Sequence, residues 1–181
     1  MKQKTHIHIF GASGSGTTTI AKSVCDILEY EHFDSDNYFW LPTNDPFTVE
    51  RPKNECMTLM RGDLSRTPKW ILSGSLTGWG DILISYFDLV VFVYVPQDIR
   101  LERLKKREYE RYGNKILPGG AKYEDSEKFL GWASAYDVGT RNGRSLPKHE
   151  ACLNKIKCPV LKIINDNLEI SIKAVLDAIR K

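Results

Sequence analysis

The segment from Gly11 to Thr18 has the sequence Gly-Ala-Ser-Gly-Ser-Gly-Thr-Thr. A β-rich stretch at residues 5–10 precedes it, and residues 17–30 carry apolar side chains at helical spacing. A glycine-rich turn between a strand and a helix can direct backbone N–H groups at an anion, and the positive end of the helix dipole adds to the attraction. The segment therefore predicts a phosphate-binding loop. A plain turn without a ligand is the alternative, although three glycines with intervening serines exceed what a tight turn requires.

Outside this loop, apolar runs alternate with helical patterns along the whole chain. Further strands are expected at residues 32–34, 70–72, 88–95 and 159–164. Helices are expected at residues 53–66, 97–112, 124–137, 145–156 and 168–180. Five strands that alternate with helices predict an α/β fold with a parallel sheet, whose ligands lie beyond the carboxyl ends of the strands. We expect a single domain over residues 1–181.

Composition and charge narrow the class of protein. Hydrophobic residues make up 41% and charged residues 27%, which is typical of a globular chain and excludes general disorder. The net charge is only +3 and the basic residues cluster between Arg100 and Arg111, so we expect a local anion site and no nucleic-acid partner. Four dispersed cysteines without zinc-ligand spacing, and no apolar run of about 20 residues, predict a cytoplasmic protein without a membrane partner.

Position 17 departs from the usual phosphate-binding motif, Gly-x-x-x-x-Gly-Lys-Ser/Thr. Thr17 stands where the lysine would contact the β- and γ-phosphates, and Thr18 occupies the position whose hydroxyl binds Mg²⁺. The anion nest is therefore expected without its point charge. Thr19 follows at the start of the predicted helix, where a structural role is the simpler interpretation.

Arginines recur on one face of the helix expected at residues 97–112. Arg100, Arg103, Arg107 and Arg111 are three or four positions apart, so their guanidinium groups form a row that could bind phosphate. A solvated face paired with neighbouring glutamates is the alternative. A second basic pair, Arg141 and Arg144, could reach the same anion, whereas the nearby His149 is interpreted as a surface residue.

Acidic and basic side chains also follow the second strand. Asp34 and Asp36 lie at the expected ligand edge of the sheet, where they could position a substrate hydroxyl or hold Mg²⁺ through water. Ordinary turn chemistry is the alternative for this polar run. Arg51 and Arg61 flank the next helix and are candidates for binding a phosphate or carboxylate of an acceptor.

Three features together resemble the small P-loop kinases of the nucleoside monophosphate kinase group, which includes adenylate, cytidylate, shikimate and gluconate kinases. They are the loop Gly11–Thr18, Asp34-Ser-Asp36, and Val95-Pro96 followed by the arginine helix. The resemblance implies a P-loop NTPase three-layer sandwich with a five-stranded parallel sheet in the order 2-3-1-4-5. It also implies a helical acceptor-binding insert at about residues 37–68 and a lid at about residues 107–145.

By this resemblance the protein would use ATP and Mg²⁺ and transfer the γ-phosphoryl group to a small acceptor, in the first instance a nucleoside monophosphate. Thr18 would bind the metal, Asp34, Asp36, Arg51 and Arg61 the acceptor, and Arg107, Arg111, Arg141, Arg144 and Asp36 would act in catalysis. The nucleotide would contact Gly11, Ala12, Ser13, Gly14, Ser15, Gly16, Thr17, Thr18, Thr19 and Arg103, with Arg103 beside the adenine.

Two other functions remain open. A regulatory protein could bind nucleotide without catalysis, because Thr17 replaces the lysine. A GTPase is the weaker alternative, since Asn154-Lys155-Ile156-Lys157 matches the guanine-reading motif only in part.

Overall fold

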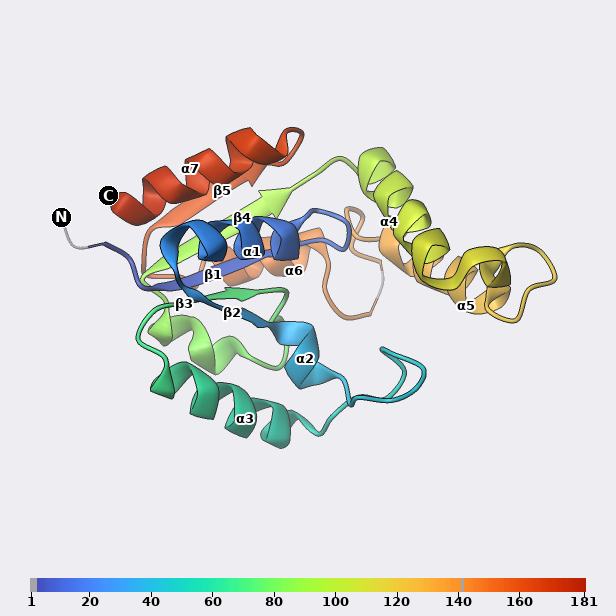
Figure 1. The fold of residues 1–181 in the computed structure, drawn as a ribbon, viewed down its shortest axis with the longest axis horizontal. Coiled ribbons are helices and arrows are strands. Elements are labelled where there is room, and N and C mark those ends of the chain that lie inside the picture. The colour runs from blue at the N-terminus through green and yellow to red at the C-terminus, as the bar shows by residue number, and fades with distance from the viewer. Residues whose placement is uncertain (1–2, 141) are drawn as a thin grey trace.

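The core of the molecule is a five-stranded parallel sheet (Figure 1). In the computed structural model, which describes residues 3–140 and 142–181, the strands are β1 (His6–Gly11), β2 (Glu31–Asp34), β3 (Trp70–Ser73), β4 (Leu89–Tyr94) and β5 (Val160–Ile164). Their order is β2-β3-β1-β4-β5 and every pair is parallel, which confirms the predicted fold class and strand order. The carboxyl ends of all five strands therefore meet at one edge.

Helices cover both faces of this sheet. The α-helices are α1 (Thr17–Leu28), α2 (Ser35–Phe39), α3 (Lys53–Arg66), α4 (Gln97–Tyr112), α5 (Tyr123–Ser134), α6 (Leu146–Leu153) and α7 (Leu168–Arg180). Two 3₁₀ helices, η1 (Asp81–Tyr86) and η2 (Gly113–Ile116), complete the described elements. Among the described residues, no helix has both the length and the apolar content needed to cross a membrane.

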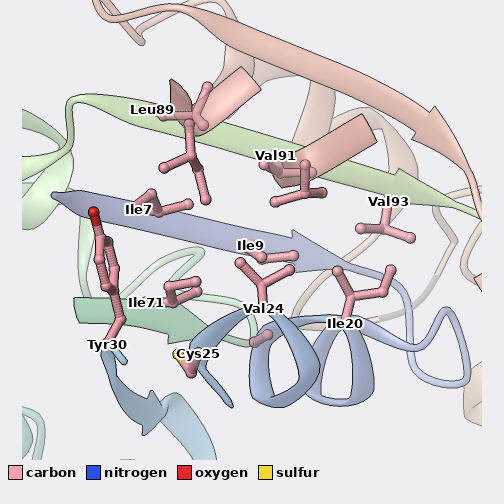
Figure 2. Close-up of a cluster of buried hydrophobic side chains, with 13 residues drawn as sticks. Ile7, Ile9, Ile20, Val24, Cys25, Tyr30, Ile71, Leu89, Val91 and Val93 are labelled. Atoms are coloured by element: carbon pink, nitrogen blue, oxygen red, sulfur yellow. The ribbon is translucent and has the colours of Figure 1, made fainter. Parts of the chain in front are cut away.

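Alternation along the central strand divides the core into two layers. Ile7 and Ile9 of β1 point into a cluster formed with α1 and α7, which Figure 2 shows in part. Phe10 points to the opposite face and packs in a second cluster with side chains from α3, η1 and α6. The short central strands are thus apolar on both faces, as expected for a covered parallel sheet.

The buried histidine of β1 lies inside the second layer. His8 is buried, and its Nε2 lies 2.9 Å from the carbonyl oxygen of Gly74, the residue after β3. Burial lowers the pKa of His8 to about 4, against a smaller opposing effect of this hydrogen bond, so the ring is neutral at pH 7. His8 therefore has a structural role in the core.

The helices α4 and α5 extend the molecule beyond the carboxyl edge of the sheet (Figure 1). α4 begins at Gln97, directly after Pro96, and α5 packs against it. The glycine-rich loop between β1 and α1 lies at the base of this extension. The loop, the start of α2 and the start of α4 follow β1, β2 and β4, so they meet at the carboxyl edge of the sheet.

Candidate functional site

The loop from Gly11 to Thr18 depends on its glycines. Gly14 and Gly16 have φ angles of 81° and 89°, in the left-handed region that disfavours larger residues. A Cβ atom on Gly11 would lie 2.2 Å from the carbonyl oxygen of Val93, and one on Gly14 would lie 2.8 Å from that of Arg100. Both the loop conformation and its close packing on β4 and α4 therefore exclude side chains at these positions.

Residues distant in the sequence fix the orientation of this loop. Asn165, just after β5, donates from Nδ2 to the carbonyl oxygen of Ser15 at 2.8 Å, and its Oδ1 accepts from the Ser171 hydroxyl at 3.1 Å. Because C=O and the following N–H point in opposite directions in a trans peptide, this bond turns the Gly16 N–H away from Asn165. The anchor thus presets the orientation of a donor at the start of α1.

Arg103 of α4 provides a second anchor. Its two terminal nitrogens donate to the carbonyl oxygens of Gly14, at 3.5 Å, and Asn165, at 3.1 Å. Sequence reasoning singled out Arg103 but missed Asn165. The available signal was a polar residue directly after a strand, at the edge of the sheet where ligands bind.

The hydroxyl and carboxylate predicted for a metal site lie together. Thr18 donates from Oγ1 to Asp34 Oδ2 at 3.0 Å, and Asp34 Oδ1 accepts from the backbone N–H of Asp36 at 3.0 Å. The second bond caps α2 and holds the carboxylate beside α1. Oxygen donors of this kind are those that Mg²⁺ prefers, so the Thr18–Asp34 pair fits a magnesium ion. Thr17 is partly exposed, and Thr19 is exposed on α1.

A cation reaches the loop from the segment before α6. Arg144 donates from Nη2 to Ser13 Oγ at 3.1 Å, and its guanidinium carbon lies 5.2 Å from the centroid of the Trp132 ring. The positive charge is therefore placed at the glycine-rich loop, although Thr17 carries none. Arg141, the other arginine expected here, lies outside the described residues.

Asp36 lies within the electric field of two arginines. Burial raises the pKa of Asp36 and the neighbouring Asp34 raises it further, whereas Arg144 and Arg107 lower it, with a net shift upward. Desolvation and the neighbouring Arg111 lower the pKa of Arg107, and Asp36 is among the groups that raise it. Asp36, Arg107 and Arg144 therefore interact electrostatically, and Arg144 is the member of this group that contacts the loop.

The predicted arginine row does not act as a unit, and the interpretation of Arg100 as one of its members is wrong. Arg100 is fully buried, donates to the carbonyl oxygen of Val95 at 2.9 Å and forms an ion pair with Asp137 at 2.8 Å. Its guanidinium also lies 4.9 Å from the centroid of the Tyr136 ring. These contacts pair the positive charge of Arg100 and hold α4 to the carboxyl end of α5.

The other arginines predicted for the site, which are Arg111, Arg51 and Arg61, have separate contacts. Arg111 lies with its guanidinium carbon 5.0 Å from the Phe47 ring centroid, which connects α4 to the segment between α2 and α3. Arg51 donates from Nε to the carbonyl oxygen of Tyr38 in α2, at 2.9 Å, and so lies near Asp36 in the fold. Arg61 instead contacts the Tyr86 hydroxyl at 3.4 Å, near the amino end of β4, so the structure does not bring it to the loop.

His149 is buried, which corrects its interpretation as a surface residue. Its Nε2 lies 2.9 Å from Ser75 Oγ and its Nδ1 lies 2.7 Å from the Tyr136 hydroxyl. The ring also packs edge-on against Phe10. The helix α6 therefore presents His149 to the sheet, a placement that its charged sequence neighbours concealed.

Comparison with known proteins identifies the family. The model of the AAA domain family AAA_18 matches residues 7–129, from β1 through most of α5. The chain belongs to this family. It is 53% identical over 163 residues to the uncharacterized protein YqaC of Bacillus subtilis, a match that covers 90% of each chain. It is also 29% identical over 114 residues to the cytidylate kinase of Haloarcula marismortui, covering 56% of this chain and 58% of that kinase.

A solved structure agrees with this assignment at the level of the fold. Shikimate kinase from Bacteroides thetaiotaomicron superposes with a TM-score of 0.58 and 16% identity, covering 98% of this chain and 99% of that one. The predicted membership of the P-loop nucleoside monophosphate kinase-like group is thereby confirmed. The chain has the fold of a small-molecule kinase.

Proposed function

We propose that the protein transfers the γ-phosphoryl group of ATP to a hydroxyl group of a small acceptor. The observation that carries this proposal is the carboxylate pair at the start of α2, which the bond from Thr18 to Asp34 holds beside the phosphate loop, together with the Arg144 guanidinium, which reaches Ser13. Burial raises the pKa of Asp36, the second carboxylate of that pair, and Arg144 and Arg107 both act on it. A phosphotransferase acting on a hydroxyl needs both a proton acceptor and cations at this place.

The nucleotide's phosphates would be held by the backbone N–H groups of the loop and by Arg144. Small residues and the α1 dipole support the first contact, and the bond from Arg144 to Ser13 shows that its guanidinium reaches the loop. Arg103, beside Gly14 and Asn165, would flank the adenine. Thr18 and Asp34 would hold Mg²⁺, which neutralises charge on the phosphate oxygens when bound.

Asp36 would take the proton of the attacking hydroxyl. A new bond then forms between the acceptor oxygen and the γ-phosphorus, the bond from the γ-phosphorus to the β,γ-bridging oxygen breaks, and ADP leaves. Arg107 and Arg144 would stabilise the charge that moves onto the bridging oxygen. Arg51, close to α2, would bind an anionic group of the acceptor.

The role of Asp36 favours a hydroxyl over the nucleoside monophosphate that the family resemblance suggested first. A phosphate acceptor is already deprotonated at neutral pH, so it needs no base, and a nearby carboxylate repels it. The shikimate kinase fold and the cytidylate kinase similarity support phosphoryl transfer to a small molecule, and each is compatible with one of the two acceptor classes.

An acceptor screen tests this proposal. Purified protein, ATP and Mg²⁺ are incubated with hydroxy acids, polyols, sugars and nucleoside monophosphates, and ADP formation is measured. We expect acceptor-dependent ADP formation with a hydroxylated compound and its loss in Asp36→Asn. The matched variant Asp26→Asn, on an exposed position of α1, should retain the activity. ATP binding without ADP formation across the panel would count against the proposal.

The absence of a lysine at position 17 supports one alternative, a regulatory protein that binds nucleotide without catalysis. The variant Thr17→Lys separates the two functions. A rise from no turnover to measurable turnover would favour the regulatory protein, whereas an enzyme that relies on Arg144 should gain little.

A further inference from the structure

Two aromatic side chains on α5 lie beneath the cations of the candidate site. Phe129 and Trp132 are three positions apart on one helical face, and their rings stack with centroids 6.1 Å apart and planes inclined by 24°. Arg107 lies over Phe129 at 5.9 Å and Arg144 lies over Trp132 at 5.2 Å. This aromatic pair therefore supports one arginine from α4 and one from the segment before α6.

Trp132 also holds the backbone of the segment that carries Arg144. Its indole Nε1 donates to the carbonyl oxygen of Asn142 at 3.1 Å. Gly143 has a φ of 81°, and a Cβ there would lie 4.0 Å from Trp132 Cζ2, so the turn passes close to the ring. One side chain thus fixes both the turn and the guanidinium that the turn presents to Ser13.

Partial exposure distinguishes this pair from ordinary core residues. Phe129 and Trp132 are only half-buried, whereas Ala133 and Tyr136 of the same region are buried. A guanidinium stacked by its face on a ring keeps its N–H edge available for phosphate oxygens. Stacking also reduces the side-chain entropy that a long arginine would lose on binding.

We propose that the aromatic pair is a positioning device for the phosphate-binding arginines, with Trp132 acting through Arg144 and Phe129 acting through Arg107. The proposal rests on the proposed function, because it assigns to the two arginines the task of holding phosphate oxygens. It adds two residues, outside the glycine-rich loop, that determine how tightly the nucleotide's phosphates are bound.

A double-mutant cycle tests the link between Trp132 and Arg144. ATP affinity is measured by calorimetry for the wild type, Trp132→Leu, Arg144→Gln and the double variant. Loss of the ring should weaken ATP binding about tenfold. Because Trp132 acts through Arg144, the double variant should bind ATP no more weakly than Arg144→Gln alone. Trp132→Phe, which keeps a ring but loses the Nε1 bond to Asn142, should bind ATP with an affinity between those of the wild type and Trp132→Leu.

Controls separate positioning from loss of structure. Lys128→Gln changes an exposed residue of α5 that pairs with Glu124 at 3.8 Å, and this variant should bind ATP normally. Fully additive losses in the cycle, or wild-type affinity in Trp132→Leu, would overturn the proposal. If Trp132→Leu does not fold, Trp132→Phe and Trp132→Tyr decide: affinities as low as that of Arg144→Gln would contradict a role for the ring.

The same measurements keep the two proposals apart. A wild type that binds ATP but transfers no phosphoryl group refutes the proposed function, while the binding cycle still decides the role of Trp132. A wild type that transfers phosphoryl groups and shows additive losses refutes only the role of Trp132. A wild type that does not bind ATP refutes both.

Discussion

Replacing Asn165 with alanine removes the side chain that holds the phosphate loop to the end of β5. Asn165 is 3% exposed, and the variant loses its bonds to the Ser15 carbonyl at 2.8 Å and the Ser171 hydroxyl at 3.1 Å. Each buried group left without this partner costs about 1–3 kcal/mol, so the variant should be destabilised by about 3 kcal/mol. For a chain of this length, that lowers the melting temperature by about 6–12 °C.

Calorimetric unfolding measures the first effect and an ATP titration measures the second. Because the lost bond orients the peptide before Gly16, ATP affinity should fall along with stability. Asn167→Ala is the matched control: Asn167 caps α7 by accepting from the Ile170 N–H at 3.0 Å, a bond at the start of its own helix that does not involve the loop. Asn167→Ala should lower the free energy of unfolding by about 1 kcal/mol and leave the ATP affinity unchanged. Equal ATP affinity in the two variants would refute the anchoring role of Asn165.

Three further predictions concern pH and the glycine loop. The raised pKa of Asp36 should place the acidic limb of the kcat–pH profile above the ordinary carboxyl range, and Arg144→Gln should move it higher still, because Arg144 lowers that pKa; an unchanged limb would contradict this. The pKa of His8 is lowered from 6.5 to about 4, so the unfolded chain binds the proton first and stability should be lost as pH falls from 6.5 to 4. Urea titrations should show that the free energy of unfolding falls by about 3 kcal/mol over this pH range, and that this pH dependence is absent in His8→Gln. Gly14→Ala, at φ 81°, should destabilise the fold by about 1–3 kcal/mol and weaken ATP binding, whereas Gly131→Ala, in open space on α5, should stabilise it slightly.

The sequence predicted the elements of the fold well because their signals are local. Apolar runs located all five strands to within about two residues, and the glycine loop defined the first crossover. The strand order came from the family resemblance, since periodicity does not say which strands are neighbours. The structure then confirmed it.

The candidate site was less accessible from sequence because its contacts are long-range. The bond between Asn165 and Ser15 joins residues 150 positions apart, and no pattern around either residue indicates the other. Helical spacing placed Arg100 and Arg103 on one face of α4. It did not indicate that α5 would bury the guanidinium of Arg100. The sequence did not indicate the burial of His149, because α6 is short and polar residues flank the histidine.

The positive charge at the phosphate loop comes from a different part of the chain than in a loop with the usual lysine. A lysine at position 17 would be part of the loop itself, whereas Arg144 reaches Ser13 from a segment that Trp132 of α5 holds in place. α5 is in turn tied to the segment between α2 and α3 by the ion pair of Lys122 with Asp45. Under the proposed function, the electrostatic part of phosphate binding therefore depends on the position of α5, and contacts at the acceptor side of the molecule bear on that position. Nucleotide affinity and acceptor occupancy would then be coupled through these contacts, because any shift of α5 moves the charge that the loop itself lacks.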